Sequence, residues 1–254
     1  MQVLGIDAAW TPDRACGVAL LEKPDRGRWR CKQLAPSYGV FLGDDTEAQP
    51  SKLDHGRMLE KRDVQVVAVS MPLSRNKKMT GSREADLQIT HAFSMWKCAA
   101  ISPSPQAPGK LSEQFLKGFS KRGFELETEQ AAVGTPHRVL EVYPAPALVT
   151  LMRARQRVPY KVGKVEEYWP KESNATRIRR ALAHMREIRA ALALKISDVP
   201  DFLPRVQQVR SLAVLRPYED VLDALLCAWI GSCYADGKAR AYGDSDAAIW
   251  LPDH

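Results

Sequence analysis

Cysteine and histidine are scarce in this sequence, and neither is spaced to bind a metal ion. The five cysteines are scattered over 254 residues without a CxxC pair, so neither a zinc ribbon nor a disulfide framework is expected. The five histidines form no HExxH pattern or other ligand spacing. Any metal ion would therefore have to be held by carboxylates.

A long apolar run is also missing. The richest one, Val221–Gly231, is interrupted by Asp223 and is shorter than the ~18 residues that a membrane-spanning helix needs. Met1–Ile6 leads straight into an acid, without the basic region and apolar segment of a signal peptide. We therefore expect a soluble, cytoplasmic protein that has no membrane partner.

The sequence has no glycine-rich phosphate loop of the GxGxxG or GxxxxGK[ST] kind. This absence disfavours a nucleotide-dependent phosphotransferase. No GxSxG pattern surrounds Ser70 either, so a serine hydrolase has little support.

The apolar residues that are present make up 45% of the chain, which is enough for a sizeable core and excludes a mostly disordered protein. Three short apolar segments at the start predict a meander of strands, and the later alternation of strands with helices indicates an α/β fold. We expect one domain over residues 1–254. The expected strands are 3–8, 17–22, 28–34, 64–70, 138–143 and 249–251, the expected helices are 52–61, 83–97, 174–195 and 217–234, and 102–109 is a proline-rich loop.

Positive charge is concentrated in one helical segment, residues 153–195. Twelve basic and four acidic residues give this segment a net charge of +8, whereas the whole chain carries +7. Such a segment suits a phosphate-rich partner, because lysines and arginines that neutralise phosphates release counterions. The alternative is an ordinary solvated helix face.

Three acids lie inside apolar patterns, where an unpaired charge is costly. Asp7 ends the first predicted strand, Glu141 lies in VLEVYP, and Asp223 lies in the last apolar helix with Asp220 one turn before it. Carboxylates of this kind select Mg²⁺ or Mn²⁺. We therefore predict that Asp7, Glu141 and Asp223 bind such an ion.

Asp220 has a second interpretation, which it shares with Glu219. Both acids follow Pro217 in the first turn of the predicted helix, where negative charge favours the helix dipole.

Around these acids the chain resembles the family called domain of unknown function 429, which consists of predicted RNase H-like nucleases. The matching segments follow the family's order. They are GIDAAW (5–10), GVAL (17–20), VAVSMPL (67–73), READLQITHAF (83–93), LEVYPAPAL (140–148), PYK (159–161), EDVLDALLCAW (219–229) and IWLP (249–252). The resemblance implies a ribonuclease H-like fold: a five-stranded mixed sheet, its first three strands antiparallel, flanked by helices with helical insertions.

The resemblance also implies metal-dependent hydrolysis of phosphodiester bonds. Carried over by motif, Asp7 is the central metal ligand, Glu141 an additional acid, and Asp220 or Asp223 the acid of the last helix. Arg83 is a candidate clamp for a phosphate or a carboxylate, and Lys161 is a candidate contact to the scissile phosphate.

One departure from the family pattern concerns Ser70. The family usually carries an aspartate where VAVSMPL has this serine, and a hydroxyl cannot supply the charge of a carboxylate to Mg²⁺. Either Glu141 and Asp220 or Asp223 compensate, or metal binding is weakened, or the site no longer cuts. By the same resemblance Ser70 is a candidate contact to the substrate phosphate.

Three functions follow from these observations. The first is a nuclease that uses two Mg²⁺ or Mn²⁺ ions and carboxylates. The second is a nucleic-acid-binding protein whose catalysis is weakened by Ser70. The third is an actin-like ATP-dependent phosphotransferase. Such an enzyme needs a second domain and a glycine-rich phosphate loop, and this chain of 254 residues has no such loop and little room for a second domain.

Overall fold

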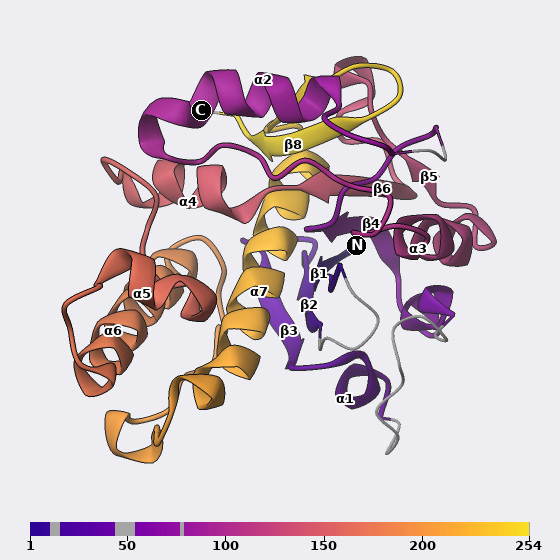
Figure 1. Ribbon diagram of the computed structural model, residues 1–254. Helices are drawn as coiled ribbons and strands as arrows, with labels where there is room; N and C mark the ends of the chain where they lie inside the picture. The colour runs from indigo at the N-terminus through magenta and orange to yellow at the C-terminus, as the bar shows by residue number, and fades with distance from the viewer. Residues whose placement is uncertain (11–15, 44–53, 77–78, 254) are drawn as a thin grey trace.

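A mixed β-sheet forms the centre of the computed structural model, which describes residues 1–10, 16–43, 54–76 and 79–253 (Figure 1). Within these residues the sheet has eight strands. They are β1 (Gln2–Asp7), β2 (Gly17–Glu22), β3 (Arg30–Ala35), β4 (Val64–Val69), β5 (Glu125–Leu126), β6 (Arg138–Val142), β7 (Ala239–Gly243) and β8 (Ala248–Pro252).

The strand order is β3-β2-β1-β4-β6-β8-β7, and β5 pairs with β6 outside this path. The first three strands form the predicted antiparallel meander. Strands β1, β4, β6 and β8 run parallel to one another, and β7 returns antiparallel to β8. The expectation of a mixed sheet is confirmed, whereas the expected number of five strands is wrong. Strands β5 and β7 were missed because one is two residues long and the other is only partly buried at the sheet edge.

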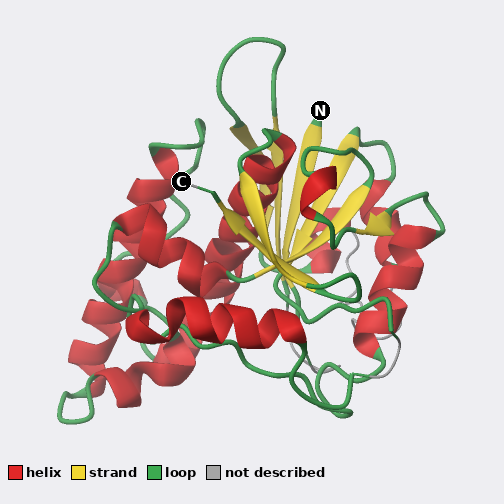
Figure 2. Cartoon of the chain, turned by 90° about the horizontal axis from the view of Figure 1, so that it is seen from above, coloured by secondary structure: helices red, strands yellow, loops and turns green. Residues whose placement is uncertain are grey.

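Seven α-helices surround the sheet in the described part of the chain. They are α1 (Tyr38–Leu42), α2 (Glu84–Phe93), α3 (Leu111–Ser120), α4 (Pro144–Met152), α5 (Val165–Tyr168), α6 (Asn174–Ala193) and α7 (Arg216–Ala235). Helices lie on both sides of the sheet, as Figure 2 shows. None of the described helices combines the length and the hydropathy that crossing a membrane requires.

Two hydrophobic cores lie on opposite faces of the sheet, because successive side chains of a strand point to opposite sides. Leu4 and Ile6 of β1 belong to the core that α1 and α3 cover, together with Phe115. Val3 belongs to the other core, which α4, α6 and α7 cover, together with Leu225. The side on which a residue of β1 lies therefore decides which helices it meets.

Helix α7 packs directly on the meander because glycines leave room for its backbone (Figure 1). A Cβ atom on Gly5 would lie 2.3 Å from the Ala224 carbonyl oxygen, and one on Gly17 would lie 2.0 Å from the Asp220 carbonyl oxygen. Both distances are shorter than any real contact, so only glycine permits this approach. Gly5 of GIDAAW and Gly17 of GVAL thus allow the acids of α7 to lie next to the end of β1.

The predicted helices show where local pattern was sufficient. Helix α6 and helix α7 lie close to the expected 174–195 and 217–234. The expected helix 52–61 is only partly testable, since 52–53 lie outside the described residues, and His55–Leu59 form a 3₁₀ helix instead. Helix α4 was not predicted; it begins at Pro144, a residue that fits the first helical position.

Candidate functional site

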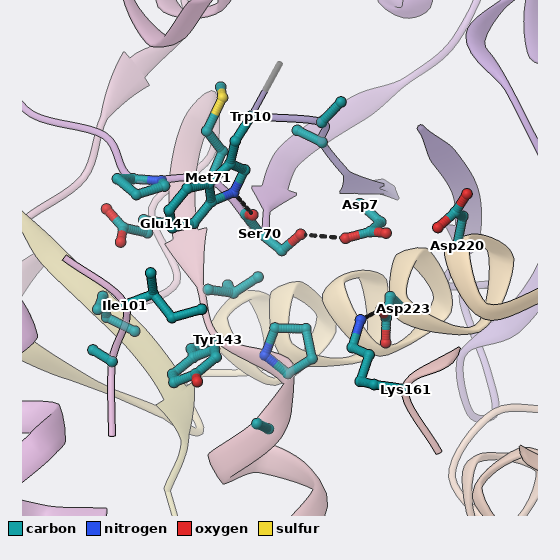
Figure 3. Close-up of a pocket in the computed structure, with 18 of the residues that line it drawn as sticks. Asp7, Trp10, Ser70, Met71, Ile101, Glu141, Tyr143, Lys161, Asp220 and Asp223 are labelled. Atoms are coloured by element: carbon teal, nitrogen blue, oxygen red, sulfur yellow. Dashed lines mark hydrogen bonds and ion pairs between the residues drawn. The ribbon is translucent and has the colours of Figure 1, made fainter. Parts of the chain in front are cut away.

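Asp7 and Ser70 lie side by side at the carboxyl edge of the parallel strands. Asp7 is the last residue of β1, and Ser70 follows β4, where its N–H donates to the Ile6 carbonyl at 3.0 Å. The Ser70 hydroxyl donates to Asp7 Oδ1 at 2.6 Å, and its carbonyl accepts from Trp10 Nε1 at 3.1 Å (Figure 3). This edge is where open α/β sheets commonly bind ligands.

A cavity of about 360 Å³ opens at this edge. Side chains of β1, the β4 and β6 ends, the 157–161 loop and α7 line it. Figure 3 shows Asp7, Asp220 and Asp223 on one side of it, and Glu141, Ile101 and Tyr143 on the other. The cavity therefore has an acidic end, formed between β1 and α7.

The acids of α7 hold the PYK segment against the helix. Asp223 is fully buried; it accepts a hydrogen bond from the Tyr160 hydroxyl at 2.5 Å and forms an ion pair with Lys161. Glu219, one turn earlier, lies 3.2 Å from Lys161 Nζ and accepts from the Val162 N–H at 2.6 Å. The two matching segments PYK and EDVLDALLCAW are thus partners in space.

Asp7 is short of positive charge. Its removal from bulk water, together with the nearby Asp223 and Asp220, raises its pKa to about 8, although Lys161 and the Ser70 hydroxyl act in the opposite direction. Lys161 is the one cation among the interactions that shift this pKa. A carboxylate in this position is stabilised by any further cation that enters the cavity.

Glu141 belongs to a different cluster. Residues two apart in a strand point to the same face of the sheet. Val139, two residues before Glu141, packs in the core on the α3 side, whereas Gly5, two residues before Asp7, faces α7. Glu141 and Asp7 therefore leave the sheet on opposite faces. Both Glu141 oxygens are held by Arg83, at 2.5 and 2.7 Å, and one also accepts from the Leu73 N–H at 2.7 Å.

Arg83 is itself fixed in this cluster. Its guanidinium also donates to Asp86 at 2.7 Å and to the Leu73 carbonyl at 2.7 Å, and the Arg83 side chain is only 9% exposed. Burial alone would favour the neutral form, but Glu141 and Asp86 raise the pKa of Arg83. The guanidinium that was predicted to bind a phosphate or a carboxylate therefore binds Glu141 and Asp86 of the protein itself.

The structure thus brings together Asp7, Ser70, Lys161, Asp220 and Asp223, and it places Glu141 with Arg83 in a separate cluster. Sequence reasoning missed Glu219 and Tyr160. Glu219 had an ordinary explanation as an acid of the first helical turn, yet its spacing of four residues from Asp223 puts both on one face of α7. That spacing was the available signal.

Some arginines of the basic segment bind to the protein itself. Arginines of α6 donate to backbone carbonyls of neighbouring loops: Arg177 to Trp169 at 3.0 Å, Arg186 to Pro204 at 2.8 Å and Arg189 to Pro200 at 2.7 Å. Arg180 pairs with Glu172 at 3.0 Å. Part of the charge excess therefore fastens loops to α6.

The fold and the site together define an α/β protein with a carboxylate-lined cavity at the carboxyl edge of its mixed sheet. The chain belongs to the family described as "Protein of unknown function (DUF429)", whose sequence profile matches residues 5–247. Comparison with curated proteins found no match. Comparison with solved structures found none either.

Proposed function

We propose that this protein hydrolyses phosphodiester bonds of nucleic acid with the help of Mg²⁺ or Mn²⁺ at Asp7 and Asp223. The observation that carries the proposal is the meeting of Asp7 with two acids of α7 at one end of the cavity, where burial and then repulsion from these acids raise the pKa of Asp7. The strand order β3-β2-β1-β4-β6, with its antiparallel meander, supports a ribonuclease H-like fold around this site.

The donor chemistry of the site fits a hard divalent cation. Among the described residues, no group of three or more His, Cys, Asp or Glu side chains is arranged to hold a metal ion. Mg²⁺, however, usually binds through one or two carboxylates and completes its shell with water and substrate phosphates. Asp7 and Asp223 supply such a pair. Glu141 is left out of this site because it lies with Arg83 on the opposite side of the cavity. Binding of the cation to Asp223 requires it to replace Lys161, which pairs with Asp223 Oδ2.

The chain's own residues prepare the site for an anionic substrate. A divalent cation, when bound, supplies Lewis acidity, which lowers the pKa of a bound water and stabilises charge on phosphate oxygens. Ser70 fixes the orientation of the Asp7 carboxylate through its hydrogen bond. Lys161, tied to Asp223 and Glu219, keeps a positive charge at the acidic end of the cavity.

Cleavage of single-stranded, duplex, hybrid and branched nucleic acids in Mn²⁺ tests this function. We expect the wild type to cut at least one of them and Asp7→Ala to lose at least 100-fold in rate, since a carboxylate that holds the cation acts in the chemical step. Glu113→Ala, on the exposed face of α3, is the matched control and keeps full activity. No cutting by the wild type, or equal cutting by Asp7→Ala, contradicts the proposal.

Ser70 favours a second candidate function, binding of nucleic acid without cleavage. Its hydroxyl occupies one oxygen of Asp7 and brings no charge to the site. This function predicts binding that weakens with salt and no cutting by the wild type. In that case Ser70→Asp adds a carboxylate next to Asp7, and we expect it to bind Mn²⁺ at least tenfold more tightly by calorimetry. Equal Mn²⁺ affinity of both proteins would remove this candidate.

A further inference from the structure

Arg157 carries a positive charge that no carboxylate of the described residues neutralises. It lines the cavity, in the loop that follows α4. Its Nε atom is enclosed by protein and has no hydrogen-bond partner. The titratable groups that raise its pKa most are the phenols of Tyr143, Tyr168 and Tyr160 and the thiol of Cys98, none of which is a carboxylate.

The position of Arg157 is fixed by its surroundings. The Arg157 N–H donates to the Trp96 carbonyl at 2.7 Å, and the next residue, Val158, is buried. Tyr143, beside the guanidinium, donates its own hydroxyl hydrogen to the Ala99 carbonyl at 3.0 Å, which leaves the hydroxyl oxygen facing Arg157 as an acceptor. Nε is closed off from solvent, so a ligand in the cavity meets the Nη groups instead, and a guanidinium that no described carboxylate pairs with favours an anion there.

The rest of this part of the cavity suits a nucleotide. The side chains of Trp10, Ile101 and Tyr143 offer apolar and aromatic surface on which a base can stack. A cavity of about 360 Å³ is at the small end of the range for ligand pockets, ~300–1,000 Å³, so it holds one nucleotide rather than a stretch of duplex.

We propose that Arg157 binds the phosphate of a single nucleotide unit that enters the cavity. The inference builds on the proposed function, whose reacting phosphodiester lies at the acidic end, and it names the substrate class: a strand end, an unpaired nucleotide or a free nucleotide. Arg157 is thus a substrate-binding residue beside Tyr143, which lies across the cavity from Asp7 and Asp223. Its guanidinium presents a fork of N–H donors that matches two phosphate oxygens.

Calorimetry in EDTA tests the inference without a metal ion and without cleavage. The probes are the four ribonucleoside 5′-monophosphates, the corresponding nucleosides and inorganic phosphate. We expect the wild type to bind at least one monophosphate at least tenfold more tightly than its nucleoside. Arg157→Gln weakens that binding about tenfold or more, and Arg157→Lys, which keeps the charge but not the fork, weakens it less.

The matched control is Arg210→Gln, which removes the same charge from an exposed position outside residues 153–195 and outside the cavity lining, and leaves the binding unchanged. Wild type that binds none of the monophosphates, or Arg157→Gln that binds them as the wild type does, overturns the inference. If Arg157→Gln fails to fold in a thermal melt, the wild type decides: a nucleoside that binds as tightly as its monophosphate overturns the inference. Because no cation is present, these outcomes are independent of whether Asp7 supports cleavage.

Discussion

The carboxylate of Asp7 links the stability of this protein to pH. Its pKa rises from 3.8 to about 8 on folding, so the folded protein holds this proton more tightly than the unfolded chain does. Below pH 3.8 the side chain is protonated in both states. Between pH 3.8 and about 8 the free energy of unfolding contributed by Asp7 falls as pH rises, and above about 8 it stays at its minimum.

We therefore predict that Asp7→Asn stabilises the protein at pH 8 and has little effect at pH 4. The amide removes the cost of burying a charge and the repulsion from Asp223, and it still accepts the hydrogen bond from Ser70. A gain of at least about 1 kcal/mol, or ~2–4 °C in Tm, is expected at pH 8. Thermal melts at both pH values measure it.

Thermal melts in the presence of Mn²⁺ show whether the gain in Tm comes from removing the Asp7 charge or from a general effect of the substitution. Mn²⁺ should raise the Tm of the wild type at pH 8 and leave that of Asp7→Asn unchanged, because binding to the folded state alone stabilises it. Equal Tm values of the two proteins across the pH range would contradict the assigned cause of the pKa shift.

At the scale of elements, the packing of α7 on the meander places the acids. We predict that Gly17→Ala lowers the free energy of unfolding by about 1–3 kcal/mol. The added Cβ would lie 2.0 Å from the Asp220 carbonyl oxygen and push α7 away from β2. Urea unfolding measures the loss. Gly81→Ala is the control, because no atom lies within 4 Å of its added Cβ. A Gly17→Ala variant as stable as this control would show that α7 does not depend on the close approach.

The same elements show how far sequence could reach. The first three strands and helices α6 and α7 were predictable because their apolar periodicity is local. The convergence of Asp7 with Asp223 was anticipated through the buried acids. The separation of Glu141 was not, because it depends on strand register and on a clamp by Arg83 from a distant helix start. Likewise, the pairing of Lys161 with Asp223 needs the long-range docking of the PYK segment on α7.

For the whole molecule, some of the basic residues bind to the protein itself, and others are exposed to solvent. Arg177, Arg186 and Arg189 donate to carbonyls of the protein itself. Arg155 and Lys171 are exposed and make no ion pair with a described residue. The charge that can meet a nucleic acid is therefore smaller than the net charge of +7 implies.

We predict a shallow salt dependence of single-strand binding, because few phosphates are neutralised. With about three contacts, the logarithm of the binding constant should fall with a slope of roughly −2 against the logarithm of salt concentration, at ~0.7 per contact. The triple variant Arg155→Gln, Lys171→Gln, Arg179→Gln should weaken binding and flatten this slope, and it should leave Tm nearly unchanged, since all three side chains are exposed.

Arg186→Gln is the control. It should lower Tm, because it releases the Pro204 carbonyl, and it should keep the slope. Fluorescence anisotropy over a salt series measures the slope; one that is equally steep in the triple variant would place the nucleic-acid surface away from the basic segment.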